Sequence, residues 1–458
     1  MTPLHRAAIN NHAQVVKFLL EKNFPVDPRD VNCSTPLLLA SAVGGLETVK
    51  VLLGCAADVT LKDCNLRSVL HVAIGHSRTL ETLLKATPSK QLIKEKDVDG
   101  FAPIHYAVQS GNVQDVSLLI SSDMTATEVV SDSLDTALHL AARHGFSDIS
   151  ELLLKHRNER LINAENNQER TALHLACMEG HSAVTAVLAP DSAIQGDINE
   201  RTPLHMAATQ GSLKCVELVI QFHPGCLNIP DKNENTALNM AAIAGHAPIV
   251  KYMMSLDQLA ITCNTRNKNA LDLAIEYGWE NVAMVIIGHD RWREALHPTD
   301  NGGLCQIEIL LQKMPRVVER LLDHCIEEEG QATDNNYKVT YDLRLIQGMN
   351  TAEVVTTYSL NCLRTMVKYK REACIGHPIC YNLMSLKWKK FGWITFMLNF
   401  CMFFMFLIVM TYFVVKNKAE WQGKTCKRMQ NRGDVFQGIF FSNVVYLILI
   451  FMTFVLLL

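Results

Sequence analysis

The chain has 458 residues, which is more than one ordinary compact domain holds and enough for several. Its formal net charge of −3 creates no overall basic field, so we expect no nucleic-acid partner. The 14 cysteines are irregularly spaced, and the first residues lack the apolar core of a secretory signal. Composition therefore argues against a disulfide framework and favours reduced thiols that face the cytosol.

One six-residue pattern recurs throughout residues 1–287. Its nine occurrences start 31 to 35 residues apart and read TPLHRA (from Thr2), TPLLLA (Thr35), SVLHVA (Ser68), APIHYA (Ala102), TALHLA (Thr136 and again Thr171), TPLHMA (Thr202), TALNMA (Thr236) and NALDLA (Asn269). This signature at this period is typical of ankyrin repeats, helical pairs that bury their apolar faces only against neighbouring pairs. We therefore predict an ankyrin-repeat solenoid of about nine repeats over residues 1–287.

Single positions within the unit have physical roles. A Thr or Ser at the start is suited to cap the first helix, and Pro is tolerated directly after it. A glycine nine residues after the start can adopt the left-handed conformation that ends this helix before the chain reverses. Seven units carry that glycine: Gly44, Gly111, Gly145, Gly180, Gly211, Gly245 and Gly278.

Histidine occupies one fixed position in six units, at His5, His71, His105, His139, His174 and His205. A metal site needs several ligands close together, whereas a whole unit separates these rings. We therefore expect them to support the turn through hydrogen bonds and expect no bound metal. The first unit begins at Thr2 with no polar capping unit before it, so we expect the chain to be incomplete at its N-terminal end.

Residues 288–390 are predicted to form a mixed α/β linker that precedes the membrane. Residues 306–324 space their apolar side chains at three and four, with a break at Pro315, which favours amphipathic helix. Residues 337–346 alternate apolar and polar side chains, which favours a half-buried strand. Glu327, Glu328 and Glu329 and the polar residues after them read as a solvated loop.

Two long apolar runs follow, and we predict a transmembrane helix for each. Residues 391–415 contain no charge, and at ~1.5 Å per residue such a helix exceeds the ~30 Å hydrocarbon core. The second run covers residues 435–458, where the chain stops. The connecting loop, residues 416–434, carries Lys416, Lys418, Lys424, Lys427, Arg428 and Arg432, which by charge alone would place it in the cytosol. The repeat array, its cysteines and the missing signal instead favour a cytosolic N-terminus. The predicted fold class is thus mostly α: solenoid, mixed linker and two transmembrane helices.

Three segments sharpen this reading: RWREAL at residues 291–296, a twenty-residue step from Cys305 to Cys325, and HPICYNLMSLKW at residues 377–388. Repeats precede these segments and the two apolar runs follow them. In this combination the whole chain resembles the ankyrin subfamily (A) of transient receptor potential cation channels. The resemblance implies a ligand- or temperature-gated, non-selective channel subunit of the plasma membrane. It implies a multi-pass homotetramer, permeant cations such as calcium, no other cofactor, and cytosolic proteins bound on the ankyrin surface. The chain would then be incomplete at both ends.

The same resemblance makes Cys305 and Cys325 candidate sensors of electrophiles, because linker cysteines of the family react with irritants. The chemistry requires a thiolate, which a helix N-terminus would favour at Cys305, and His324 and Arg320 at Cys325. Two positions depart from the family pattern: Leu304 stands where well-known members carry lysine, and Gly348 follows Gln347 where a third reactive cysteine is expected.

Other candidate chemistry is limited. Lys368, Lys370 and Arg371 could contact anionic lipid headgroups or inositol phosphates, or simply form a solvated helix face. Cys374, His377 and Cys380 stand at three-residue steps, but three ligands without a partner cluster argue against zinc. No enzyme motif is present, so we expect no catalysis. The alternative function is a membrane-tethered ankyrin scaffold that has no pore and binds protein partners.

Overall fold

The secondary structure is almost entirely helical in the described part of the chain, as predicted. The computed structural model describes residues 1–86, 91–155, 159–296, 306–329, 338–342 and 361–423. The chain divides into two units, Met1–Cys380 and Tyr381–Leu458. The ankyrin array, the linker helices and a small sheet belong to the first unit.

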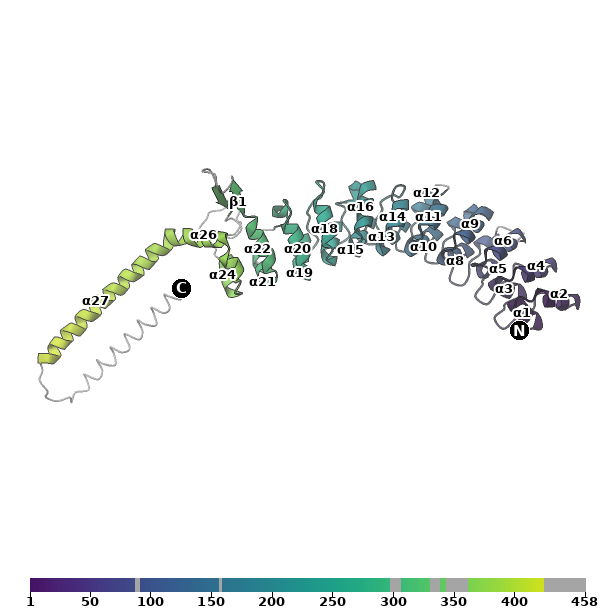
Figure 1. Cartoon of the computed structure of the whole chain (residues 1–458), viewed down its shortest axis with the longest axis horizontal. Coiled ribbons are helices and arrows are strands. Elements are labelled where there is room, and N and C mark those ends of the chain that lie inside the picture. Colours follow the sequence, from purple (N-terminus) through teal and green to yellow (C-terminus); the bar gives the residue numbers. More distant parts are fainter. Residues whose placement is uncertain (87–90, 156–158, 297–305, 330–337, 343–360, 424–458) are drawn as a thin grey trace. The chain divides into compact units, whose positions relative to one another are not determined.

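Each occurrence of the six-residue pattern opens a short helix, and a second helix follows it. The first helices are α1 (Pro3–Ile9), α3 (Pro36–Ala42), α5 (Val69–Val72), α8 (Pro103–Gln109), α10 (Ala137–His144), α13 (Ala172–Glu179), α15 (Pro203–Gln210), α17 (Ala237–Ala244) and α19 (Ala270–Tyr277). The second helices are α2 (Ala13–Glu21), α4 (Leu46–Gly54), α6 (Ser77–Ala86), α9 (Val113–Ser122), α11 (Ser147–Leu154), α14 (Ser182–Leu188), α16 (Leu213–Phe222), α18 (Ala247–Met254) and α20 (Glu280–Ile287). Successive first helices pack side by side, as do successive second helices (Figure 1).

Short helical segments lie in the connections after some second helices: α7 (Gln91–Lys94), α12 (Glu159–Ile162) and the 3₁₀ helices η1 (Met124–Glu128), η2 (Pro224–Cys226) and η3 (Trp292–Ala295). The apolar core lies between the repeats. Its inward positions are the Leu and Ala of the pattern; Leu138 and Ala141, for example, are fully buried. An alanine there leaves room for the next helix to approach.

Glycine ends the first helix in the predicted way. At Gly245 the backbone has φ +84°, and a Cβ would come within 2.6 Å of the Trp279 ring from the following repeat. The position therefore needs glycine for two reasons: the left-handed conformation and the close approach of the next repeat. All seven predicted glycines have positive φ.

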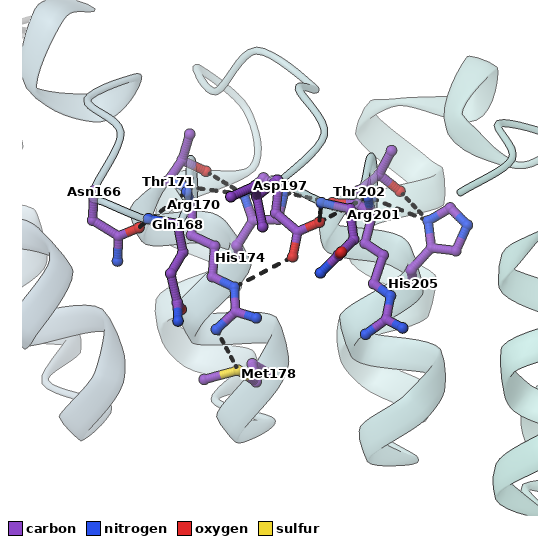
Figure 2. Close-up of polar contacts among 12 residues, drawn as sticks. Asn166, Gln168, Arg170, Thr171, His174, Met178, Asp197, Arg201, Thr202 and His205 are labelled. Atoms are coloured by element: carbon purple, nitrogen blue, oxygen red, sulfur yellow. Dashed lines mark hydrogen bonds and ion pairs between the residues drawn. The ribbon is translucent and has the colours of Figure 1, made fainter. Parts of the chain in front are cut away.

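The repeat histidines form straps between neighbouring repeats. In the sixth repeat, the Thr171 backbone N–H donates to His174 Nδ1 at 3.1 Å, and His174 Nε2 lies 3.0 Å from the Arg201 carbonyl oxygen of the seventh (Figure 2). An N–H can only donate and a carbonyl can only accept, so Nε2 carries the proton. The hydrogen-bonding role predicted for these residues is confirmed. Burial lowers the pKa of His174 to about 4, which keeps the ring neutral at pH 7.

A second set of polar contacts joins the loops that precede the first helices. Asn166 Oδ1 accepts the backbone N–H groups of Gln168 (2.9 Å) and Arg170 (3.1 Å), which closes the loop of the sixth repeat. From that loop, Arg170 reaches Asp197 of the next loop, with 3.4 Å between Nε and Oδ2 (Figure 2). Arg201 lies 3.8 Å from Asp231 in the same way.

Two further helical pairs extend the first unit beyond the ankyrin signature. Helix α21 (Gln306–Lys313) packs on α19, and α22 (Pro315–Asp323) packs on α20. The predicted amphipathic helix and its break are therefore confirmed, because Pro315 starts a new helix. Helices α24 (Asn361–Lys368) and α25 (Glu372–Gly376) pack on α21 and α22 in turn.

A two-stranded antiparallel sheet follows α22. Strand β1 (Ile326–Glu329) pairs with β2 (Lys338–Tyr341), and Ile326 lies opposite Tyr341. The predicted strand is confirmed in its described part, but the solvated loop predicted at Glu327–Glu329 is wrong. Three consecutive glutamates disfavour a strand locally, whereas pairing with β2 satisfies their backbone groups.

The second unit contains the membrane candidate. After α26 (Pro378–Lys387), a π-helical turn (Trp388–Gly392) leads into α27 (Trp393–Gly423). Within the described residues α27 is the one helix long and apolar enough to span a membrane, over Trp393–Tyr412. It continues eight residues past the predicted end at 415, because residues 416–423 contain no proline and mostly tolerate a helix. The second predicted span, 435–458, lies outside the described residues.

Candidate functional site

The predicted site residues fall in the linker, in the part of the first unit beyond the last repeat. Cys305 lies outside the described residues. Cys325 follows α22 and directly precedes β1. Lys368 ends α24, and Lys370 and Arg371 lie in the turn before α25. The cysteine and the basic residues thus lie on different elements of the linker.

Cys325 is fully buried. Its Sγ lies 3.3 Å from the carbonyl oxygen of Leu321, one turn earlier, and donates to it. Burial raises the pKa of the Cys325 thiol to about 12; the Asp342 carboxylate adds to this rise and Arg293 opposes it. This is the reverse of the thiolate-favouring environment that the sequence predicts, because burial outweighs any nearby cation.

Charged residues from both sides of Cys325 in the sequence lie close enough to influence its thiol. Arg293, in the RWREAL segment, places Nη2 3.6 Å from Asp342 Oδ2 and 3.8 Å from Glu327 Oε1. The backbone N–H of Asp342 donates to the Cys325 carbonyl oxygen at 2.8 Å. A residue after the last repeat and a residue after β2 are thus joined to each other next to Cys325. The sequence marks the RWREAL segment but does not predict that its Arg293 pairs with Asp342, because the two residues are 49 positions apart.

Aromatic contacts complete this cluster. The guanidinium of Arg293 lies 4.8 Å from the centroid of the buried Trp292 ring, within the range of a cation–π contact. The Trp292 and His324 rings lie 6.3 Å apart between centroids. His324, predicted to activate Cys325, therefore packs against an indole.

The basic cluster separates into two environments. Lys368 and Lys370 are exposed, and the Lys368 ammonium lies 5.4 Å from the Tyr369 ring centroid. The half-buried Arg371 instead donates from Nε to the Leu311 carbonyl (3.0 Å) and from Nη2 to the Gln312 carbonyl (2.7 Å). Those carbonyls belong to the last turn of α21, which has no helical donors of its own. The guanidinium is therefore engaged inside the first unit.

The third candidate set is similarly dispersed. Cys374 lies 3.7 Å from the Pro315 carbonyl, His377 Nε2 lies 3.2 Å from Asp323 Oδ1, and Cys380 Sγ lies 3.9 Å from the Met366 sulfur. Among the residues that the structure describes, no group of three or more His, Cys, Asp or Glu side chains is arranged to hold a metal ion.

Comparison with known proteins gives two results. The family model described as "Ankyrin repeats (3 copies)" matches residues 1–63, 39–132, 70–160, 138–230 and 184–267, which together cover residues 1–267. The overlapping matches agree with the helical pairs seen from α1 onward.

Channel proteins match over a longer stretch. "Transient receptor potential cation channel subfamily A member 1" from Homo sapiens is 29% identical over 433 residues, which is 91% of this chain and 38% of that protein. The protein of that name from Drosophila melanogaster is 28% identical over 452 residues, covering 94% of this chain and 38% of the relative. A Caenorhabditis elegans homologue is 25% identical over 381 residues, 72% of this chain. The chain thus spans about two fifths of the length of its first two relatives.

Proposed function

This chain belongs to the ankyrin-repeat family, and 91% of its length is similar to a subfamily A transient receptor potential channel. From this premise we propose that it supplies the ankyrin array, the linker and the first membrane span of a cation channel subunit. The channel would be non-selective and gated by a ligand or by temperature. Neither family is enzymatic, and catalysis forms no part of the proposal.

One observation carries the proposal: the match to the channels continues beyond the ankyrin repeats. The ankyrin match ends at residue 267, whereas the channel match over 433 residues must include much of the linker and candidate span. Ankyrin arrays occur in many unrelated proteins, but an array, this linker and an apolar helix in this order is a more specific combination. Packing also supports a role for the linker in transmitting movement of the array. Helices α21 and α22 pack on the last repeat, and α24 and α25 pack on them in turn.

The remaining features belong to the same proposal. The array would lie in the cytosol and bind cytosolic proteins, and the complete subunit would form a multi-pass homotetramer in the plasma membrane that conducts cations such as calcium. Cys305 and Cys325 would sense electrophiles; for Cys325 this requires the buried thiol to become exposed first. Lys368 and Lys370 would contact anionic headgroups, worth about 1 kcal/mol per charge near the surface.

The test is the coding sequence downstream of Leu458, combined with whole-cell current from the complete reading frame. We expect further apolar spans with a re-entrant pore segment, and a cation current that a pore-lining substitution abolishes. A stop codon directly after Leu458 in the native transcript would contradict the proposal and leave a membrane-tethered scaffold.

A further inference from the structure

The histidine straps follow one rule from repeat to repeat. The ring at the fixed position lies close to the carbonyl of the residue just before the next repeat starts. His139 reaches the Arg170 carbonyl at 2.9 Å, His174 reaches that of Arg201 at 3.0 Å, and His205 reaches that of Asn235 at 3.0 Å. Three consecutive joints between the fifth and eighth repeats are therefore strapped in the same way.

The next joint, between the eighth and ninth repeats, departs from this rule. The eighth repeat carries Asn239 at the histidine position, and the carbonyl that a strap would reach belongs to Lys268. Asn239 is fully buried, yet neither its Oδ1 nor its Nδ2 has a hydrogen-bond partner within the described residues. Thr236 Oγ1, which in other repeats faces the ring, is buried without a partner as well. An unsatisfied buried amide destabilises the folded state.

The loops at this joint have also lost their ion pair. Arg170–Asp197 and Arg201–Asp231 join the sixth to the seventh and the seventh to the eighth repeat. The corresponding positions at the next joint are Asn235 and Asn264, which form a neutral amide contact at 3.0 Å between Asn264 Nδ2 and Asn235 Oδ1. Arg170 and Asp197 form a long charge-assisted hydrogen bond at 3.4 Å, whereas Arg201 Nε lies 3.8 Å from Asp231, beyond hydrogen-bond distance. What the next joint has lost relative to both is therefore the attraction between opposite charges.

The next joint, between the ninth repeat and the linker, is held by other residues. Asn269 Nδ2 donates to the Ala295 carbonyl at 2.7 Å, Gln306 donates to Asp272 of the ninth repeat, and Lys313 reaches the Ile275 carbonyl at 3.4 Å. Trp279 Nε1 of the ninth repeat does donate to the Ile243 carbonyl of the eighth at 2.8 Å, as His246 contacts the Thr209 carbonyl one joint earlier at 3.0 Å. What this joint lacks is the strap at the fixed histidine position, while α21 and the linker hold the ninth repeat on its other side.

In other repeats that depart from the rule, the residue at the histidine position destabilises the fold less. The second repeat carries Leu38, which has no polar side-chain atom to satisfy. In the fourth repeat His105 keeps its bond to the Ala102 backbone N–H at 2.9 Å, although its Nε2 has no partner among the described residues. Among the described residues of the array, only the eighth repeat combines an unsatisfied buried amide with the loss of the loop ion pair seen at the two preceding joints.

We infer that the joint between the eighth and ninth repeats is the place where the array opens first. Repeats one to eight would move as one body, and the ninth repeat would move with the linker helices. In a stack stabilised by nearest-neighbour contacts, the weakest interface sets where local opening occurs. The inference rests on these contacts and holds whether or not the chain belongs to a channel.

Hydrogen exchange of the full chain, followed by mass spectrometry, tests the inference. In the wild-type protein we expect peptides from α17 and α19 to exchange faster than the equivalent peptides from α13 and α15. The variant Asn239→His supplies a ring that can reach the Lys268 carbonyl, and we expect it to slow exchange in α17 and α19 about tenfold. Asn239→Leu removes the unsatisfied amide without adding a strap, and we expect a smaller slowing.

The reverse variant, His205→Asn, removes a strap and is expected to speed exchange at the joint between the seventh and eighth repeats. It keeps the inference testable if Asn239→His fails to fold. The inference is overturned if α17 and α19 of the wild-type chain exchange no faster than α13 and α15. It is equally overturned if Asn239→His slows exchange no more than Asn239→Leu does, or if His205→Asn leaves exchange unchanged.

Discussion

At the scale of single residues, Arg371 shows how a residue that the sequence places in an exposed basic cluster can instead stabilise the fold. The sequence groups it with Lys368 and Lys370 as a basic cluster. In the structure its guanidinium binds the Leu311 and Gln312 carbonyls at the end of α21. A cation there also complements the negative end of the helix dipole. Only the two lysines are then free to face a lipid surface.

Replacing Arg371 with alanine should loosen the contact of α24 and α25 with α21. Two bonds from a charged donor are lost and two terminal carbonyls lose their partner, which should destabilise this contact by about 2 kcal/mol. Hydrogen exchange in α24 and α25 should therefore quicken, while exchange in α10 stays unchanged. Arg371→Lys keeps the charge without the forked geometry and should lie between the two. Identical exchange in all three proteins would show that the contact is unimportant.

Cys325 should react slowly in the conformation seen here. The thiol is buried and its pKa is about 12, so little thiolate exists at pH 7. A maleimide added to the native chain should modify the exposed Cys55 and Cys64 at least about tenfold faster than Cys325. Mass spectrometry at short times measures the order. Modification of Cys325 as early as Cys55 would mean that the buried thiol becomes exposed readily.

At the scale of single elements, the glycine that ends each first helix sets how closely the next repeat can approach. Gly245 and Gly278 both have positive φ, but only Gly245 faces a ring of the next repeat; a Cβ at Gly278 would meet nothing within 4 Å. The two positions therefore separate the conformational requirement from the packing requirement.

Gly278→Ala should destabilise the array by about 1–2 kcal/mol through the left-handed conformation alone. Gly245→Ala adds a collision with Trp279 and should destabilise it by at least about 3 kcal/mol in total. The midpoint of urea unfolding, followed by helical circular dichroism, measures both effects. Equal midpoints for the two variants would show that the ring moves aside without penalty.

Helix α27 should insert into a bilayer as an isolated segment. Trp393–Tyr412 is apolar and has no buried residue within its own unit, which suits contact with lipid. In a glycosylation-reporter assay we expect the segment to insert. Met402→Lys combined with Phe403→Lys should prevent insertion, since each central lysine opposes it by about 3 kcal/mol. The same two charges at Thr411 and Tyr412 should be tolerated, because lysine near the end of a helix can reach the interface. Insertion of the central double variant would contradict this assignment.

At the scale of the whole molecule, the buried histidines make the stability of the array depend on pH. An unfolded histidine takes up a proton near pH 6.5, whereas burial lowers the pKa of His105 and His174 to about 4 in the folded chain. The unfolded state therefore binds more protons between these values, so stability is complete above about pH 6.5 and falls as pH drops towards 4. Each of the two residues should contribute roughly 3 kcal/mol to this loss.

Urea unfolding midpoints at pH 7.5 and pH 5 measure the effect, since most carboxylates stay ionised over this range. We expect a clearly lower midpoint at pH 5. His174→Gln removes one titrating group and should reduce the difference between the two midpoints. A midpoint that does not change with pH would mean that the rings take up protons as readily in the folded array as in the unfolded chain.

Much of the architecture follows from local rules repeated along the chain. The start of each first helix, the glycine at its end and the hydrogen-bonded histidine recur at fixed positions in the unit and contact the same positions of the next unit, so the repeated pattern predicts them and the structure agrees. The helix over Trp393–Tyr412 follows from an uncharged run of sufficient length. Domain boundaries at 287, 390, 415 and 434 stay predictions, as do the roles of Cys305, Cys325, Lys368 and Lys370.

The sequence by itself determined the repeat array, its helix ends and the apolar span, because each depends on periodicity or on neighbouring residues. Tertiary structure alone decided that Cys325 is buried, that the Arg293–Asp342 ion pair lies near it, that Arg371 caps α21, and that the glutamates of β1 pair with β2. It also showed that Asn239 is left without a partner. These outcomes depend on groups brought together from distant parts of the chain, and contact at a distance in sequence leaves no local pattern to read.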